Sequence, residues 1–324
     1  MYFNNNNKFL HGVMFHHFHD KNNFIKTQGS INSDQLVKII KYIGRENIIN
    51  ANEFINNILN KKKVEKKVCL TFDDALKCQE NIALPILEDF KIKAFFFIYT
   101  DIFKYNPHNI EIVRHFRHAF YKNINEFYKD FISIVKSKLG RKEIFNFFIF
   151  NKEKILKFRK KFPIYTKYDV EFRFIRDHLL NNFEYNNIIS ELYLSKNFKP
   201  KKYHKHLLMN KESLQKLNKL NHEIGLHSHS HPTKIINFNY QNQHKEYLTN
   251  FKLLKKIIKT KYGIRSMSHP CGSYDNNTLK VLKKMNILLG FKESMLIDNN
   301  MKKINNSKFE IARVDHSSII KSMN

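Results

Sequence analysis

The stretch Val68-Cys69-Leu70-Thr71-Phe72-Asp73-Asp74 is the part of the sequence from which we predict the fold and the chemistry. An apolar run ending in two adjacent carboxylates is typical of a buried parallel strand that delivers polar groups to the rim of a sheet. Because side chains alternate along a strand, Asp73 and Asp74 would point in different directions and could hold different roles. Two neighbouring carboxylates repel each other unless a cation or a proton intervenes. A metal held by one, with a base role for the other, would relieve this repulsion, whereas an ordinary pair of helix caps is the simpler interpretation.

The surrounding sequence has the rhythm of an α/β fold. A helix is predicted from Ala75 or Leu76 to Asp89, and the apolar run Ala94–Tyr99 follows it as a strand. Strand, helix and strand in this order predict a βαβ unit and a parallel sheet. Further elements are predicted as strands at His11–Phe18, Glu223–His227, Ser266–His269, Leu288–Phe291 and Ile311–Val314, and as an amphipathic helix at Gln243–Tyr262. Residues 101–212 are rich in Phe, Tyr, Lys and Asn, and their spacing predicts a mostly helical insertion.

The second polar cluster is His227-Ser228-His229-Ser230-His231-Pro232, at the end of a short predicted strand. Where a strand turns into a loop or a helical turn, His227 and His231 can point the same way. Two imidazoles and one carboxylate leave a fourth metal position open, which is the arrangement of a catalytic zinc site. The simpler interpretation is a chance pair of surface histidines, since the chain has 17.

The third cluster is His269-Pro270-Cys271-Gly272-Ser273-Tyr274-Asp275. Pro270 and Gly272 on either side of Cys271 predict a tight loop at a strand end, which can aim a backbone N–H group into a site. An ordinary turn is the simpler interpretation of this cluster when it is taken alone.

Composition and charge narrow the classes of protein. Lys and Arg total 57 against 29 acidic residues, a net charge of +28, but the cations are mostly Lys scattered along the chain. We interpret them as a solvated surface and not as a specific nucleic-acid site. The three cysteines form no CxxC pair, which fits a reducing compartment. No secretory signal and no apolar run of roughly 20 residues is evident, so we expect a cytoplasmic protein without a transmembrane segment.

The three clusters together resemble the polysaccharide deacetylases of the NodB-homology type (carbohydrate esterase family 4). The resemblance rests on Thr71-Phe72-Asp73-Asp74, His227-Ser228-x-x-His231-Pro232, Pro270-Cys271-Gly272-Ser273-Tyr274 and the opening Val13-Met14-Phe15-His16. It covers about residues 10–100 and 210–316. It implies an α/β fold, a distorted (β/α)7-type barrel of the glycoside hydrolase and deacetylase kind. The chain would then be a single NodB-like deacetylase domain over residues 1–324, with the helical insertion at 101–212.

The resemblance also implies the roles of the site residues. A divalent metal, commonly zinc with cobalt or nickel as alternatives, would be held by Asp74, His227 and His231. Asp73 would be the general base that activates water. A backbone N–H group around Cys271 would stabilise the oxyanion, and Tyr274 would lie at the substrate.

Two departures from the family pattern concern the base and the acid. Many members carry an Arg two residues before the third motif's Pro, where it braces the base, but this chain has Ser268 there, and Arg265 or Arg313 could substitute. The usual Leu-x-x-His segment that supplies the general acid is absent, and Ala312-Arg313-Val314-Asp315-His316 lies roughly in its place. His316 is therefore the first candidate acid and His16 the second, although either could be a hydrogen-bonded structural histidine.

The function that the resemblance implies is metal-dependent removal of an N- or O-acetyl group from a saccharide during surface glycan biosynthesis. Without a secretory signal, we expect a nucleotide- or lipid-linked saccharide as the substrate in preference to a mature wall polymer. One alternative is a hydrolase of non-peptide C–N bonds in a non-sugar amide. Another is a non-catalytic glycan-binding member of the fold, which the missing Arg and acid favour and the intact base and ligand set oppose.

Overall fold

The computed structural model describes residues 2–3, 8–161, 165–259, 263–293 and 307–323. The chain forms two compact units, which are described separately below. The barrel unit consists of Met1–Tyr105 and Leu207–Asn324, and the helical unit consists of Asn106–His206.

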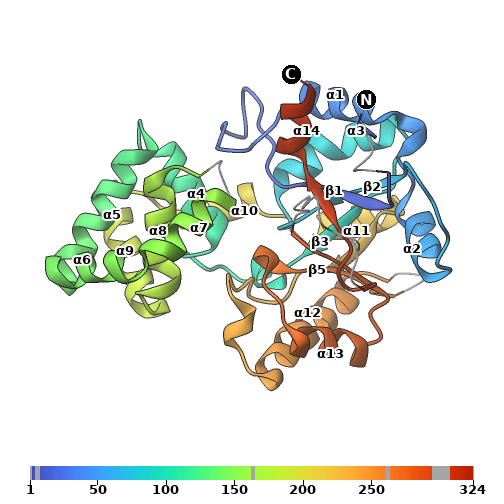
Figure 1. Ribbon diagram of the computed structural model, residues 1–324. Helices are drawn as coiled ribbons and strands as arrows, with labels where there is room; N and C mark the ends of the chain where they lie inside the picture. The colour runs from blue at the N-terminus through green and yellow to red at the C-terminus, as the bar shows by residue number, and fades with distance from the viewer. Residues whose placement is uncertain (1, 4–7, 162–164, 260–262, 294–306, 324) are drawn as a thin grey trace. The chain divides into compact units, whose positions relative to one another are not determined.

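The barrel unit is built around a parallel sheet, which has seven strands in the described part of the chain (Figure 1). The strand order β6-β5-β4-β3-β2-β1-β7 places the strand before Asp73 near the middle. A parallel bridge between Phe291 and Ile311 joins β6 to the segment before β7, so the sheet nearly closes on itself. The predicted distorted (β/α)7-type barrel is therefore confirmed. The strands are β1 (His11–Phe15), β2 (Val68–Phe72), β3 (Phe95–Ile98), β4 (Glu223–Leu226), β5 (Ser266–Ser268), β6 (Leu289–Phe291) and β7 (Arg313–Asp315).

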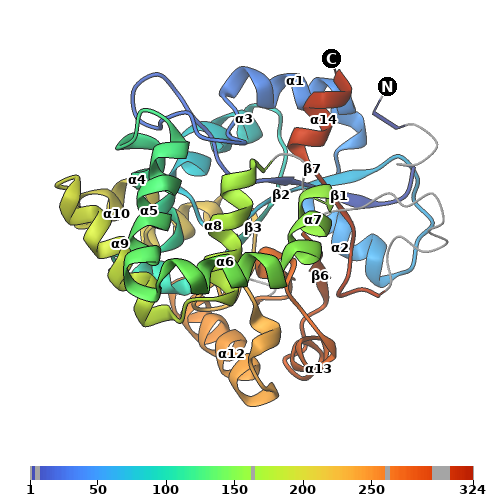
Figure 2. The ribbon, with the colours of Figure 1, turned by 60° about the vertical axis from the view of Figure 1, so that its left-hand side comes forward.

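Helices surround these strands (Figures 1 and 2). The first of them begins where the Asn32 side chain accepts a hydrogen bond from the backbone of Gln35, and it ends at Gly44, whose positive φ of 88° suits glycine. The helices of the barrel unit are α1 (Ser33–Ile43), α2 (Ala51–Leu59), α3 (Leu84–Asp89), α11 (Lys211–Lys219), α12 (Tyr240–Ile257), α13 (Asn276–Lys284) and α14 (His316–Met323). The helix predicted at Gln243–Tyr262 corresponds to α12, and residues 260–262 lie outside the described residues.

Strand alternation sorts the apolar side chains into two layers. Val68 and Leu70 pack in the cluster that also holds the helix residues, whereas Cys69 packs with Phe95 in a separate cluster bounded by strands and α2. Thr71 and Asp73 continue the Cys69 side of β2 with period two. Thr71 and Asp73 therefore lie at the carboxyl end of β2, on the same side as the cluster of Cys69 and Phe95.

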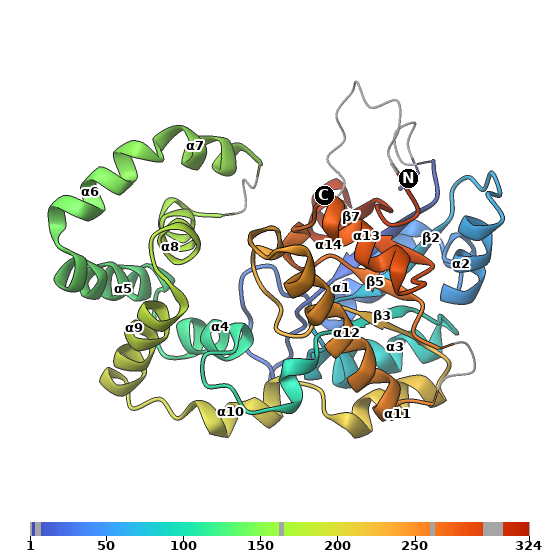
Figure 3. The same cartoon turned by 90° about the horizontal axis from the view of Figure 1, so that it is seen from below.

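The helical unit folds around its own aromatic side chains. Phe116, Phe127 and Phe172 are almost fully buried, and the Phe127 ring lies edge-on to each of the other two. Figure 3 shows α6 and α7 following one another along the rim of this unit. Its helices are α4 (Ile110–Ala119), α5 (Ile124–Leu139), α6 (Arg141–Phe150), α7 (Lys152–Lys161), α8 (Lys167–His178), α9 (Asn182–Ser195) and α10 (Pro200–Leu207), the last of which ends at the first residue of the barrel unit's second segment.

Candidate metal and active site

Asp73 and Asp74 follow β2 directly but differ in backbone conformation. The backbone N–H of Asp73 still donates to the Phe15 carbonyl at 3.1 Å, so Asp73 keeps the pairing of a strand residue. Asp74 and Ala75 then adopt positive φ angles of 75° and 53°, a conformation that costs energy in non-glycine residues and is concentrated at functional sites. Because of this change in backbone direction, the two carboxylates point to different partners.

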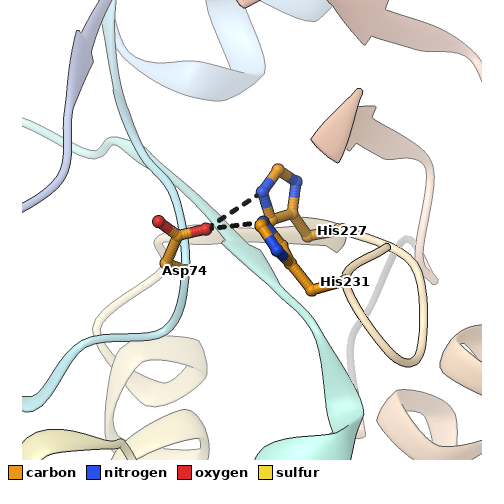
Figure 4. A group of neighbouring side chains, drawn as sticks. All are labelled: Asp74, His227 and His231. Atoms are coloured by element: carbon orange, nitrogen blue, oxygen red, sulfur yellow. Dashed lines mark ion pairs between the residues drawn. The ribbon is translucent and has the colours of Figure 1, made fainter. Parts of the chain in front are cut away.

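The Asp74 carboxylate meets the two predicted histidines (Figure 4). Its Oδ1 atom lies 3.2 Å from Nε2 of His227 and 3.1 Å from Nε2 of His231. Burial alone raises the pKa of Asp74, but the two imidazoles outweigh it and hold that pKa well below its usual value. Asp74 is therefore a carboxylate at neutral pH, and it faces two ring nitrogens.

The three side chains fit a divalent metal ion. One ligand atom from each lies within 4.8 Å of the others, and Oδ1 of Asp74 is buried without an accepted hydrogen bond. Metal bonds to such donors are about 2.0–2.2 Å long, so two donors on one ion lie roughly 3–3.5 Å apart, which matches the two distances from Asp74. The donor set is that of a three-ligand site with an open position.

Backbone and amide groups hold His227 in place. Its Nδ1 atom lies 2.9 Å from the Ser268 carbonyl, which favours a proton on Nδ1 and leaves Nε2 as the metal-facing nitrogen. Its backbone N–H donates to Oδ1 of the buried Asn250 at 3.1 Å, while Nδ2 of Asn250 donates to the Ile98 carbonyl at 2.9 Å. Asn250 on α12 thus links the histidine to the end of β3.

The loop between the two histidines is held by a carboxylate. Oε2 of Glu246 accepts the backbone N–H groups of His229 and Ser230 at 3.1 and 2.8 Å. Ser228 and His231 have positive φ angles of 61° and 53°, so the loop is wound tightly. The His229 ring hydrogen-bonds the Thr100 hydroxyl at 2.9 Å and is not among the three converging side chains.

Arg313 braces Asp73. Its two terminal nitrogens lie 2.8 Å from Oδ1 and 2.9 Å from Oδ2, in a bidentate pair that is almost completely buried. The Ser268 hydroxyl donates to Oδ2 at 3.1 Å and accepts from Arg313 at 2.8 Å. Burial alone raises the pKa of Asp73, but Arg313 outweighs it and lowers that pKa. Asp73 is therefore ionised and fixed in orientation.

The path of Arg313 depends on a glycine. A Cβ atom on Gly12 would lie 3.0 Å from Cγ of Arg313 and 3.2 Å from the Phe291 ring, so a larger residue in β1 would crowd the arginine. The other arginine that the sequence suggested, Arg265, instead pairs with Glu223 at 2.9 Å. Of the two candidates, Arg313 is the one that contacts Asp73.

His16 lies beside both carboxylates. Its Nε2 atom is 3.9 Å from Oδ2 of Asp73 and 3.8 Å from Oδ2 of Asp74, and about a quarter of its side chain is exposed. A partly exposed imidazole next to these two carboxylates is placed to exchange protons with a bound molecule.

His316 has the contacts of a structural histidine. Its two ring nitrogens lie 3.2 and 2.9 Å from the carbonyls of Met14 and Gly29, and its ring stacks on Phe15. Both nitrogens are thus engaged by backbone in a buried ring. The geometry favours the structural interpretation of His316 and leaves His16 as the candidate acid.

The loop after β5 is a 3-10 turn in which Cys271 has a positive φ of 50°. The backbone N–H groups of Gly272 and Ser273 are used inside this turn, where they donate to His269 and Pro270. An oxyanion role of the Cys271 backbone stays a prediction.

Tyr274 turns toward the segment that follows β6. Its hydroxyl donates to Oε1 of Glu310 at 3.0 Å, and its ring stacks on His269 with the centroids 4.2 Å apart. Burial and this hydrogen bond raise the pKa of Tyr274 to about 12, so it stays protonated at neutral pH. Its predicted role at the substrate stays a prediction.

A family model described as polysaccharide deacetylase matches residues 60–120 and 164–289, which make up more than half of the sequence. The chain belongs to the polysaccharide deacetylase family. Members of this family are hydrolases that deacetylate carbohydrates, so the chain is a deacetylase by class. Among curated proteins, no match to the chain is found.

Solved structures with a similar fold include two described as a deacetylase and a de-N-acetylase. Streptococcus pyogenes deacetylase PplD, in complex with acetate, has a TM-score of 0.54 and 13% identity, over 98% of this chain and 98% of that chain. A de-N-acetylase from Aggregatibacter actinomycetemcomitans has a TM-score of 0.54 and 13% identity, over 97% and 99%. IcaB from Ammonifex degensii has a TM-score of 0.50 and 12% identity, over 95% and 91%.

Three residues that support the candidate site were not predicted from the sequence. Gln79 is fully buried and donates from Nε2 to the backbone carbonyls of His16 and Asp73, at 3.0 and 2.6 Å, so it ties the ends of β1 and β2 together. Asn250 and Glu246 are the other two, and both accept backbone N–H groups of residues 227–231. In the sequence each is one polar residue in a helical segment that contains other polar residues, which is too common a pattern to single out a site.

Proposed function

We propose that this chain removes an N- or O-acetyl group from a saccharide with the help of a divalent metal. The observation that carries the proposal is the meeting of Asp74, His227 and His231 next to an Asp73 carboxylate that Arg313 holds in place. The family supplies the class of reaction, and an acetylated saccharide is its substrate class.

The chain's own residues divide the work as follows. A divalent ion held by Asp74, His227 and His231, with zinc as our first choice, would supply Lewis acidity for the acetyl carbonyl and for water. Asp73 takes a proton from the attacking water, because its ionised carboxylate is fixed beside the ligand set. His16 gives a proton to the leaving amine, or to the leaving hydroxyl of an O-acetyl ester, and acetate is released.

The substrate is best sought among saccharides of surface glycan biosynthesis that carry a nucleotide or lipid. One protein with the same fold is a de-N-acetylase, and this supports an N-acetyl group as the first choice. Non-catalytic binding is less well supported, because Asp73, Arg313 and the ligand set are all present.

Metal content tests the ligand set. After incubation with zinc and removal of excess ion, the wild type should hold about one ion per chain. His227→Ala and His231→Ala should each weaken zinc binding by more than about a hundredfold, since losing a ligand exceeds the cost of losing a supporting contact. His229→Ala is the matched control, because His229 lies in the same loop and bonds Thr100. A wild type that stays metal-free with zinc, cobalt and nickel, or an equal loss in the control, would contradict the site.

Acetate release from N-acetylated oligosaccharides tests the chemistry. Asp73→Asn should keep its zinc and lose about a hundredfold or more of the activity, because an amide cannot take the proton. A variant that still turns over at the wild-type rate would remove Asp73 from the role of base. Zinc binding without acetate release from any acetylated saccharide would favour the binding-only alternative.

A further inference from the structure

Exposed apolar side chains are concentrated on the helical unit. Among the described residues, the five most exposed large apolar side chains all belong to it: Phe150 at 83%, Leu194 at 82%, Phe183 at 74%, Phe145 at 65% and Ile149 at 59%. Phe145, Ile149 and Phe150 lie on a single helix, α6. Exposed apolar groups gathered in this way mark a surface that contacts something other than water.

Basic side chains flank the exposed apolar groups of α6 and α7. Residues 141–160 contain seven Lys or Arg and two Glu, and all seven cations are exposed. On α6, Lys142 precedes Phe145 by three residues and Ile149 by seven, so the three share one helical face. The ammonium of Lys154 lies 5.9 Å from the centroid of the exposed Phe150 ring.

The same alternation continues on α7. Leu156 is exposed, and Lys152 and Lys160 lie four residues before and after it, one turn away on each side. We call the exposed side of residues 141–160 the α6–α7 surface. It combines bulky apolar side chains with long cations whose stems can extend away from an apolar layer.

We propose that the α6–α7 surface docks on the surface of a lipid bilayer with anionic headgroups. Helices that lie in the interface of a membrane carry Phe and Leu with Lys and Arg beside them, since the apolar groups enter the acyl boundary while the cations bind the headgroups. The cores of protein–protein interfaces are depleted in Lys, so this mixture favours lipid over a protein partner. In the described part of the chain no helix is long and apolar enough to cross a membrane, and docking needs none.

The helical unit supplies its own control. Phe183 and Leu194 on α9 are as exposed as Phe145 and Phe150, but residues 182–195 contain two Glu and no Lys or Arg. Helix α9 itself therefore offers no cation to an anionic headgroup, and Lys138 is already paired with Glu191, so these apolar groups should contribute little to docking.

The experiment is co-sedimentation of the full chain with vesicles. We expect binding to phosphatidylglycerol–phosphatidylcholine vesicles, little binding to phosphatidylcholine alone, and weakening by salt. Phe145→Ser/Phe150→Ser should weaken the binding roughly tenfold or more, because two inserted side chains are lost. Lys154→Glu/Lys157→Glu should weaken it as well. Phe183→Ser/Leu194→Ser should bind as the wild type does.

Several results would overturn this proposal. One is a wild type that ignores anionic vesicles, and another is an equal loss in the α9 control pair. A self-association in solution that Phe145→Ser/Phe150→Ser abolishes would assign the surface to a second copy of the chain. All these side chains are exposed, so thermal unfolding should confirm that the variants stay folded. Vesicle binding is independent of acetyl hydrolysis, so this proposal and the proposed function can fail separately.

Discussion

Arg313 and Asp73 form an ion pair that water hardly reaches. A buried pair of this kind contributes little net stability over apolar residues, but the loss of one partner leaves a charge without compensation. The pair therefore fixes the orientation of the carboxylate, and the chain depends on both members.

We predict that Arg313→Ala lowers the free energy of unfolding by about 3–5 kcal/mol and abolishes acetate release. Arg313→Lys keeps the charge but loses the bidentate fork, so it should recover part of the stability and little of the activity. Denaturant unfolding and the acetate assay measure the two effects.

Arg265→Ala is the control for Arg313. It breaks the ion pair with Glu223, so it should lower stability while the folded protein keeps its activity. Full activity in Arg313→Ala would show that Asp73 does not need the brace.

At the residue scale, the sequence predicted the three side chains that converge in the structure, but it did not decide which arginine contacts Asp73. Asp74, His227 and His231 are found from short motifs, because each motif is local in the chain. The choice between Arg265 and Arg313 depends on a pairing between residues 240 positions apart. Local sequence patterns carry no information about such a pairing. Gly12 leaves space for the arginine, but nothing in the sequence distinguishes it from other glycines in strands.

The histidine loop is the element on which the ligand geometry depends. Glu246 on α12 holds two consecutive N–H groups of this loop without touching a proposed ligand's ring. We predict that Glu246→Ala weakens zinc binding roughly tenfold, because supporting contacts of this kind tune a metal site. The free energy of unfolding should change by at most about 1 kcal/mol, since the glutamate is only partly buried.

Glu246→Gln separates the hydrogen bonds from the charge. The amide oxygen can still accept the two N–H groups, so zinc titration of this variant should resemble that of the wild type. An unchanged zinc affinity in Glu246→Ala would mean that the positive φ angles of the loop are maintained by other contacts.

Elements were predicted well where apolar runs set them and less well where polar turns did. The strands before Asp73 and before the histidine loop lie where the apolar pattern predicts them. The helix expected from Ala75 or Leu76 to Asp89 begins at Lys77 and passes through a π-helical turn at Gln79–Ala83 into α3. Ala75 is excluded from it, because the left-handed Asp74 and Ala75 cannot lie inside a right-handed helix. The first strand ends at Phe15 instead of Phe18, which leaves His16 in a loop beside the carboxylates.

At the scale of the whole molecule, buried neutral histidines link stability to pH. Burial lowers the pKa of His11 from 6.5 to about 4, and it does the same for His222, where the hydrogen bond to Glu88 offsets only part of the effect. Above pH 6.5 neither the folded nor the unfolded chain protonates these rings, so their contribution is complete. As the pH falls from 6.5 towards 4, the unfolded chain binds protons first and is favoured.

We therefore predict that the free energy of unfolding falls by about 1.4 kcal/mol per pH unit for each of these histidines below pH 6.5. Denaturant unfolding in the presence of a chelator measures this without the added effect of metal loss. In His222→Gln, the free energy of unfolding should fall with pH by about 1.4 kcal/mol per pH unit less than in the wild type, because one fewer proton is taken up on unfolding. A stability that is flat between pH 6.5 and 5 would contradict the buried neutral state of both rings.

The predicted domain organisation rests on composition, on helical spacing and on the part of the chain that the family resemblance covers. Helices α4 to α10 lie between Ile110 and Leu207, and the family model does not match residues 121–163 of the sequence. Whether the chain acts as one domain with an insertion stays a prediction, as does its cytoplasmic location. The spacing of apolar residues predicts the helices, but it does not predict that the chain divides into two compact units.

The position of Arg313 on β7 has a consequence for protein synthesis. During translation, the arginine that pairs with Asp73 is made 240 residues after it. Chains fold from the amino-terminal side as they leave the ribosome, so the nascent sheet holds Asp73 without its counter-ion until β7 is complete and pairs with β1. We expect ribosome-bound chains and premature termination products that lack β7 to be inactive, even when the metal ligands have already been synthesised. The carboxylate that we propose as the base thus gains its ion-pair partner only when β7 joins β1.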